Sequence, residues 1–367
     1  MRKIVLLLFL SIVCLKIQAQ TYKDSIKGDW IPVQSTYGAN KIHDHNTYAI
    51  FDFNDSLLLI KWLGSKEVVP LSLQFDDDQL LVDDSLKWSV VYFSKDSLKL
   101  QFDDSILMTF VPLLRFEVGE INIDINKLIH NSWLVMDTNN YRERIEFTDV
   151  KWDSQESNEM KCLTLDEGDD YFWDDLNRWQ VFQYKGFWYF DRTFQQHNNF
   201  LHQIIESNPD TIRLVVNIGT KQKHLSLVQI PVCDEYDHIK QTLESKSWKA
   251  TSTSICDSME RKFEMRFGKQ FVDTIYKRAE RMIKDDLEFR FNPEQLIIGT
   301  SNKAVNDCKW RLSNDGRYII FLDQSRNPEY FEIVELSERK LVLKNVFYFS
   351  HLFEMGNFEQ NYTLELE

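Results

Sequence analysis

Short stretches in which hydrophobic and polar residues alternate dominate the chain. Every second residue is apolar in 98–102, and the same alternation returns in 144–148 and 287–291. A period of two places apolar side chains on one face of a β-strand and polar side chains on the other. The pattern therefore predicts antiparallel strands with one buried face and one face in water.

Between residues 30 and 112 the pattern predicts eight short strands. Polar turns such as Asn54-Asp55-Ser56 and Asp76-Asp77-Asp78 separate them. The predicted strands are 30–36, 47–53, 57–63, 68–75, 80–82, 86–92, 98–102 and 106–112. Strands at a spacing of about 8–12 residues are typical of an all-β sandwich or barrel.

One segment departs from the period of two. Apolar residues at three- and four-residue spacing predict an amphipathic helix near 269–284, inserted into the all-β chain and placed to cover a barrel mouth or a domain contact. The apolar positions are Phe271, Ile275, Ala279, Met282 and Ile283.

A threefold internal repeat organises the chain. Each copy has a short helical lead-in, then a polar or small pair, then a tryptophan, and these tryptophans are Trp30, Trp133 and Trp248. Later in each copy an apolar strand, a polar turn and an alternating strand follow one another. We expect the three tryptophans to be structural anchors at the start of each first strand, not ligand contacts.

The length of the repeat favours separate domains. Units of about 100 residues are long enough to bury their own cores, whereas solenoid and propeller units run to about 20–50 residues. We expect three tandem β-barrel-like domains at 20–119, 120–232 and 233–367, after an N-terminal segment of residues 1–19.

Residues 1–19 have the layout of a secretory signal peptide. A basic start, an apolar run over 4–15 broken only by Ser11, and Ala19 before the expected cleavage site follow in that order. An uncleaved anchor and a lipoprotein modified at Cys14 are the alternatives. Cleavage before Gln20 would remove three positive charges and change the formal charge from −14 to −17.

Composition excludes several classes of function. The chain has 43 Lys+Arg against 57 Asp+Glu, and this balance argues against nucleic acid and anionic lipid as partners. Its 11 glycines are never adjacent or separated by one residue, so the Rossmann and P-loop phosphate motifs are absent. Beyond the predicted signal, no run of 18 apolar residues predicts a membrane span.

The start of the first unit resembles that of a known family. Gly28-Asp29-Trp30 opens a predicted first strand after a helical lead-in, which resembles the Gly-x-Trp start of lipocalins. The second and third units have Asn131 and Lys246 where Gly28 stands. The resemblance implies three tandem lipocalin-like domains of a bacterial secreted type, each an eight-stranded up-and-down barrel that can hold one small ligand.

Four cysteines remain beyond the predicted signal. Export would permit disulfides, and the expected domain boundaries favour the pairs Cys162–Cys233 and Cys256–Cys308. Free buried thiols, which behave as small hydrophobic groups, are the alternative.

The most aromatic stretch of the chain is the candidate contact site. Trp173 precedes a run of four adjacent rings that includes Phe187, Trp188 and Tyr189. In a strand, two of the four rings in the run must face outward. These rings suit stacking on a sugar or an apolar ligand, and contact between domains or an aromatic-filled barrel are the alternatives.

Motifs that carry catalysis are missing. No His-Glu-x-x-His, Gly-x-Ser-x-Gly or Cys-x-x-Cys sequence occurs, so we expect no catalytic, metal or cofactor site. The sequence favours an exported, non-enzymatic binding or interaction protein that is periplasmic, on the outer surface or secreted. Its partner would be a small apolar or glycan ligand, or a protein. A structural subunit of an envelope assembly is the second hypothesis, and a carbohydrate-active enzyme is the third.

Overall fold

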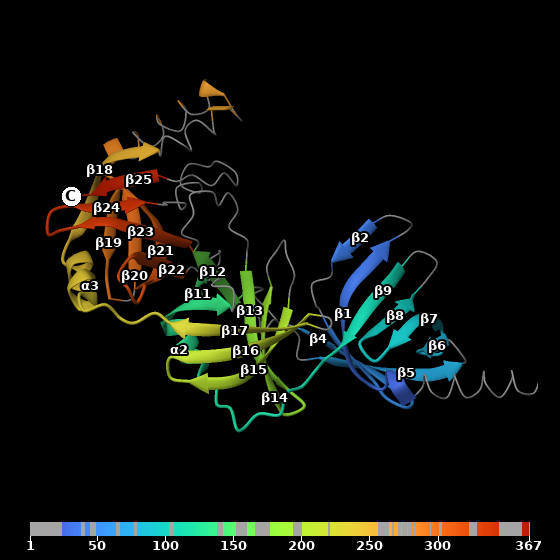
Figure 1. The fold of residues 1–367 in the computed structure, drawn as a ribbon. Coiled ribbons are helices and arrows are strands. Elements are labelled where there is room, and N and C mark those ends of the chain that lie inside the picture. The colour runs from blue at the N-terminus through green and yellow to red at the C-terminus, as the bar shows by residue number, and fades with distance from the viewer. Residues whose placement is uncertain are drawn as a thin grey trace, which may run out of the picture.

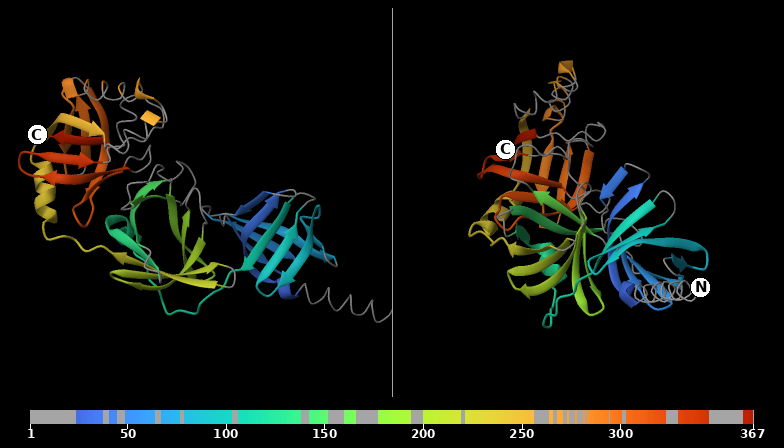
Figure 2. Two further views of the ribbon diagram at one scale, coloured as in Figure 1. Left: turned by 45° about the horizontal axis from the view of Figure 1, so that its top comes forward. Right: turned by 45° about the vertical axis from the view of Figure 1, so that its right-hand side comes forward.

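A computed structural model places three antiparallel β-barrels in a row, with the second barrel between the other two (Figures 1 and 2). The described residues are 24–37, 41–44, 49–63, 67–76, 79–102, 106–137, 142–151, 160–165, 177–193, 200–218, 221–255, 264–265, 268–270, 273, 277, 281, 283–293, 295–300, 303–322, 329–344 and 362–366. The predicted signal peptide lies outside them.

Barrel 1 contains all eight strands that the sequence predicts. The strands are β1 (Gly28–Tyr37), β3 (Ala49–Phe53), β4 (Leu57–Trp62), β5 (Val68–Asp76), β6 (Gln79–Val82), β7 (Leu86–Ser94), β8 (Ser97–Gln101) and β9 (Ile106–Pro112). Each pairs with the next, and β1 pairs with β9 to close the sheet. The unpredicted strand β2 (Lys41–Asp44) extends the far end of β1 as a hairpin.

Barrels 2 and 3 are closed and have eight strands each. Barrel 2 comprises α2 (Ile125–His130), β10 (Ser132–Asp137), β11 (Arg142–Lys151), β12 (Met160–Leu165), β13 (Asn177–Tyr184), β14 (Phe187–Thr193), β15 (Phe200–Asn208), β16 (Thr211–Ile218) and β17 (Lys221–Gln229). Barrel 3 comprises α3 (Tyr236–Glu244), β18 (Ser247–Ile255), β19 (Glu288–Phe291), β20 (Gln295–Thr300), β21 (Lys303–Leu312), β22 (Tyr318–Leu322), β23 (Glu329–Leu336), β24 (Leu341–Lys344) and β25 (Tyr362–Leu366). Between β18 and β19 the described residues of 269–284 are helical. The predicted all-β class with one inserted helix is confirmed.

Aromatic side chains fill the interior of each barrel. At the centre of barrel 2, the ring of Phe147 lies 4.8 Å from that of Trp179 and 5.7 Å from that of Phe190, centroid to centroid. Trp88 and Phe102 in barrel 1 and Phe321 and Phe331 in barrel 3 pack at 4.5 and 4.2 Å. In a barrel of eight strands the interior is just wide enough for side chains to fill.

The repeated tryptophans make the same contact in all three barrels. Trp30, Trp133 and Trp248 are buried, and each indole Nε1 donates a hydrogen bond to a backbone carbonyl of the preceding helical residues. The bonds measure 2.7, 3.1 and 2.9 Å and end on Ile26, Leu128 and Leu243. Because the indole N–H is satisfied inside the core, the whole ring can be buried there without an unpaired donor.

A second repeated feature lies in the sixth strand of each barrel. The register shifts between Val90 and Tyr92 in β7, between Ile204 and Glu206 in β15, and between Ile333 and Glu335 in β23. A β-bulge at this point bends the strand and increases its twist. The bulge supports the threefold repeat independently of the tryptophans.

The predicted disulfide between Cys162 and Cys233 is wrong. Cys162 lies in the core of barrel 2, whereas Cys233 lies before α3 and its backbone N–H donates to Asn314 of barrel 3. Cys308 is likewise a thiol in the core of barrel 3, so the predicted bridge to Cys256 is not formed. Cys256 itself lies outside the described residues.

Candidate functional site

The aromatic stretch of β14 divides between two environments. Phe187 and Tyr189 point outward from barrel 2 and pack in one apolar cluster with Ile31 and Ile50 of barrel 1. Trp188 packs against the interior of its own barrel. The outward rings of this stretch therefore lie against the neighbouring barrel, and Tyr189 is fully buried there. Trp173 lies outside the described residues.

Two carboxylates of barrel 1 receive the tip of the β13–β14 hairpin. Asp29 and Asp52 face each other across β1 and β3, and Lys185 Nζ lies 2.9 Å from the first and 2.7 Å from the second. The hydroxyl of Tyr184 donates a hydrogen bond of 2.7 Å to Asp29, and Arg115 completes the ion pairs. Both carboxylates are almost fully buried, so these cations compensate charges that water does not reach.

Burial at this contact changes the acidity of the tyrosines. Removal from water, together with the negative charge of Asp52, raises the pKa of Tyr184 far above its usual range. Burial also raises the pKa of Tyr189, although Arg115 opposes the shift. Tyr184 therefore stays protonated and keeps its role as a hydrogen-bond donor to Asp29.

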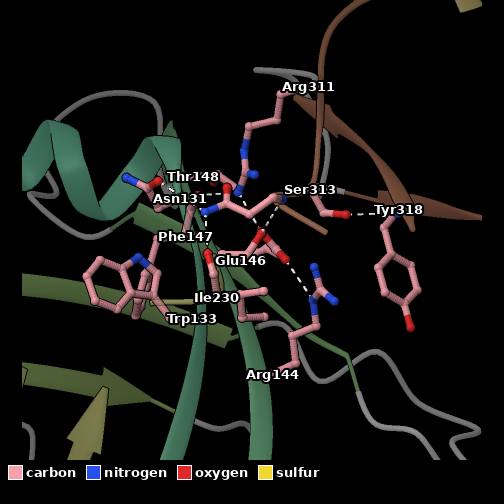
Figure 3. Close-up of polar contacts among 12 residues, drawn as sticks. Asn131, Trp133, Arg144, Glu146, Phe147, Thr148, Ile230, Arg311, Ser313 and Tyr318 are labelled. Atoms are coloured by element: carbon pink, nitrogen blue, oxygen red, sulfur yellow. Dashed lines mark hydrogen bonds and ion pairs between the residues drawn. The ribbon is translucent and has the colours of Figure 1, made fainter. Parts of the chain in front are cut away.

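A buried carboxylate of barrel 2 binds barrel 3 in the corresponding way (Figure 3). Glu146 is fully buried and accepts from Ser132 Oγ at 2.9 Å, from Arg144 Nε at 2.8 Å and from Arg311 Nη2 at 2.8 Å. Arg311 belongs to β21 of barrel 3, whereas the other residues belong to barrel 2. Three donors, two of them cationic, make the burial of this charge tolerable.

Arg144 extends the network to the next turn of barrel 3. Its guanidinium donates to both oxygens of Asp315, at 2.6 and 3.0 Å, and stacks on the ring of Tyr318 with 4.5 Å to the centroid. Burial disfavours the charge on Asp315, but the hydrogen bonds and charge of Arg144 outweigh it and lower the pKa of Asp315. Burial lowers the pKa of Arg144, but the hydrogen bonds to Asp315 and Glu146 and the charges of these carboxylates outweigh this effect and raise it.

Asn314 inserts between the two barrels beside this ion pair. Its backbone N–H donates to Ser132 Oγ at 3.1 Å, and its side-chain amide donates to the carbonyl of Ile230 at 2.7 Å. Next to it, Ile320 of barrel 3 packs against Leu163 of barrel 2. The contact thus combines a polar centre with an apolar margin.

The strand that carries Glu146 corrects one expectation from the sequence. The alternation in 144–148 predicts a wet face with Arg144, Glu146 and Thr148. All three are buried, because barrel 3 covers Arg144 and Glu146 and because Thr148 donates a 2.6 Å hydrogen bond to the carbonyl of Lys161. Polar residues on the outer face of a barrel are buried where a second barrel docks.

The two contacts share one geometry. The acceptor is the residue before the repeated tryptophan together with its cross-strand partner, which we call the docking pair: Asp29 with Asp52 in barrel 1 and Ser132 with Glu146 in barrel 2. The element received is the hairpin between the fourth and fifth strands of the next barrel, which we call the docking hairpin. These hairpins are β13–β14 and β21–β22. The docking site is therefore repeated along with the fold.

The side chains at these sites hold one barrel against the next. Across the described parts of the chain, no three His, Cys, Asp or Glu side chains come together in a way that would hold a metal ion. The buried charges at the contact of barrels 2 and 3 are matched, since Arg144 and Arg311 face Glu146 and Asp315. Such pairs fix the register and orientation of the two surfaces.

Sequence reasoning singled out Phe187 and Tyr189 as candidate contacts but missed the charged residues at both docking contacts. The residue before each tryptophan was visible as part of the repeat, and Asp29 and Ser132 occupy that position. The cross-strand partners of Asp29 and Ser132 could not be predicted from the sequence. Pairing Ser132 with Glu146, for example, requires the register of β10 on β11. In the described part of the chain no helix is long and apolar enough to span a membrane.

Comparisons with known proteins give only weak likenesses. No protein-family model and no curated protein sequence matches the chain. A crystal structure of transferrin binding protein B from Haemophilus parasuis aligns at 8% identity and a TM-score of 0.15, covering 92% of this chain and 75% of that one. The Helicobacter pylori beta clamp bound to a DNA ligase peptide aligns at 8% identity and a TM-score of 0.17, covering 92% and 91%.

Proposed function

We propose that the chain is an exported, non-enzymatic interaction protein that uses the outer surfaces of lipocalin-like barrels to contact another protein. The observation that carries the proposal is the filling of the barrel interiors. Trp179 is almost completely buried between Phe147 and Phe190, at the place where a lipocalin-type ligand would sit. A small-molecule carrier needs a largely pre-formed cavity instead.

The outer surface of barrel 1 supports a protein partner. Of the ten large hydrophobic side chains that are exposed among the described residues, six belong to barrel 1. They are Leu57, Trp62, Val68, Leu86, Val91 and Tyr92. Trp62 and Val68 are close neighbours, because Lys61 pairs with Val68 across β4 and β5. Exposed aromatic and aliphatic groups of this kind are enriched in protein interfaces.

The alternative of a structural accessory subunit in an envelope assembly is favoured by the docking contacts. Their ion pairs, such as Arg311 with the fully buried Glu146, would hold the three barrels as one rigid row. A rigid arrangement of barrels is compatible with a structural subunit that separates other proteins and also with a protein that binds a partner. Both hypotheses place the functional surface outside the barrels.

Native mass spectrometry of the exported protein tests the proposal. We expect the mass under native conditions to equal that of one or more copies of the chain, alone or with a protein partner. A stoichiometric small-molecule adduct that is lost on denaturation would contradict a protein-binding role. As a matched control, Trp179→Ala should open an apolar cavity that accepts benzene, provided that its circular dichroism remains native.

N-terminal sequencing of the same sample tests cleavage before Gln20.

A further inference from the structure

Barrel 3 has a docking pair that neither of the other two described barrels covers. In barrel 3 the residue before the repeated tryptophan is Ser247, and its cross-strand partner is Arg290. Arg290 Nε donates to Ser247 Oγ at 3.0 Å and Nη2 lies 3.5 Å from Glu288. The side chain of Arg290 is 54% exposed, whereas its counterparts Asp52 and Glu146 are buried under the next barrel.

Barrel 1 has a docking hairpin that packs on neither of the other two described barrels. In barrel 1 the fourth and fifth strands are β5 and β6, and Asp76 pairs with Gln79 at the tip of their hairpin. Two residues join these strands, as two residues join β13 and β14. Asp76 is exposed.

The positions that form the apolar margin between barrels 2 and 3 are also apolar at the two ends of the row. The third residue of the fifth strand is Tyr189 in barrel 2 and Ile320 in barrel 3, and both pack on the preceding barrel. Leu81 holds this position in barrel 1 and is half-buried. On the receiving side, Ile297 lies across from Arg290 as Leu163 lies across from Glu146.

The charges at the two ends are reversed together. Inside the chain, the acidic docking pairs of barrels 1 and 2 receive the cations Lys185 and Arg311. At the ends, the docking pair contains the cation Arg290 and the hairpin contains the anion Asp76. Asp76 is the last residue of its strand, so it holds the position of Tyr184 in barrel 2, next to that of Lys185. An anion in the hairpin and a cation in the docking pair favour the contact, whereas like charges would exclude it.

We propose that the docking hairpin β5–β6 of one copy binds the docking pair Ser247–Arg290 of a second copy. Asp76 would lie against Arg290, and Leu81 against Ile297. This contact joins different surfaces of the two copies, so it is heterologous and generates open chains or closed rings. The proposal depends on the repeated docking geometry and not on the proposed protein-binding role, so either can fail alone.

Sedimentation velocity of the exported chain, over concentrations from about 1 μM to about 1 mM, tests the proposal. We expect reversible association that grows beyond the dimer with concentration. Arg290→Glu and Asp76→Lys should each raise the dissociation constant at least about tenfold, because each substitution removes one strong charge contact. The double variant Arg290→Glu/Asp76→Lys should associate within about threefold of wild type, because it exchanges the two charges.

Arg213→Glu is the matched control, since Arg213 is 60% exposed and also pairs with a glutamate, but lies in β16 of barrel 2. It should leave the association unchanged. A wild-type chain that stays monomeric up to about 1 mM would overturn the proposal. The proposal would also be overturned if Arg290→Glu associated as tightly as wild type. It would be overturned as well if the double variant failed to restore association while each variant kept the native circular dichroism.

Discussion

The guanidinium of Arg144 holds both carboxylate oxygens of Asp315, at 2.6 and 3.0 Å, and thereby joins two barrels across 171 residues of sequence. A bidentate pair of this kind fixes orientation as well as distance. Ser313 Oγ and the backbone N–H of Arg317 also donate to Asp315, so residues of its own turn orient the carboxylate in addition to Arg144.

We predict that Asp315 makes docking sensitive to acid. Because its pKa is lowered from the ordinary value of 3.8, the stability that it contributes is present at higher pH and is lost as pH falls through the lowered pKa. Urea midpoints of wild type and Asp315→Asn, measured from pH 7 down to pH 2.5, check this. Wild type should be the more stable at pH 7, and the difference should close as the pH falls below about 4. A difference that is constant with pH would contradict the assignment.

Lys185 is expected to be important for the contact between barrels 1 and 2. Lys185→Ala would leave Asp29 and Asp52 buried with one cation fewer, at an expected cost of about 1–3 kcal/mol. The cost is below that of a wholly buried pair, because Arg115 and Tyr184 remain beside Asp29. Denaturant unfolding measures the change.

Lys340 provides the matched comparison for Lys185. It pairs with Glu335 at 2.9 Å, but both side chains are well exposed. Lys340→Ala should therefore change stability by less than about 0.5 kcal/mol. Equal effects of the two substitutions would show that the docking ion pairs contribute no more than a surface pair.

Trp248 is predicted to be an anchor of barrel 3. Trp248→Ala removes a fully buried ring and its hydrogen bond to Leu243, at an expected cost of about 3–5 kcal/mol. Hydrogen exchange read by mass spectrometry should show loss of protection in β18–β24, with protection retained in barrel 2. Trp62→Ala is the control, because Trp62 is 45% exposed, and it should leave exchange nearly unchanged. Similar exchange in both variants would remove the physical basis of the tryptophan repeat.

Gly316 is predicted to be more sensitive to substitution than Gly186. It has φ of +73°, and a Cβ there would lie 2.6 Å from Ile239 Cδ1 and 3.2 Å from Cys233 Sγ. Gly186 has φ of +86° but open space around it, so Gly186→Ala should cost only the strain of a left-handed residue, about 1–2 kcal/mol. Gly316→Ala should lower the melting temperature further than Gly186→Ala. Equal melting temperatures would show that Ile239 moves away freely.

The fold could be predicted further than the site. Alternation in strands such as β8, where Leu98 and Leu100 point inward, is a local signal that the sequence carries directly. The Trp133 repeat is local as well. The burial of Glu146 is not local, because it depends on Arg311 arriving from a barrel 165 residues away. The outer face of a strand shows the same alternating polar residues whether it meets water or another barrel. The docking sites could therefore be identified only from the three-dimensional arrangement.

Small-angle X-ray scattering of the exported chain, extrapolated to zero concentration, tests most directly whether the docking contacts hold the barrels as one unit. With Lys185 bound by Asp29 and Arg144 bound by Asp315, the row in Figures 1 and 2 should be a single rigid arrangement. We expect one arrangement of the three barrels to account for the whole scattering curve. A curve that is fitted only by an ensemble in which the barrels turn independently would contradict the docking geometry.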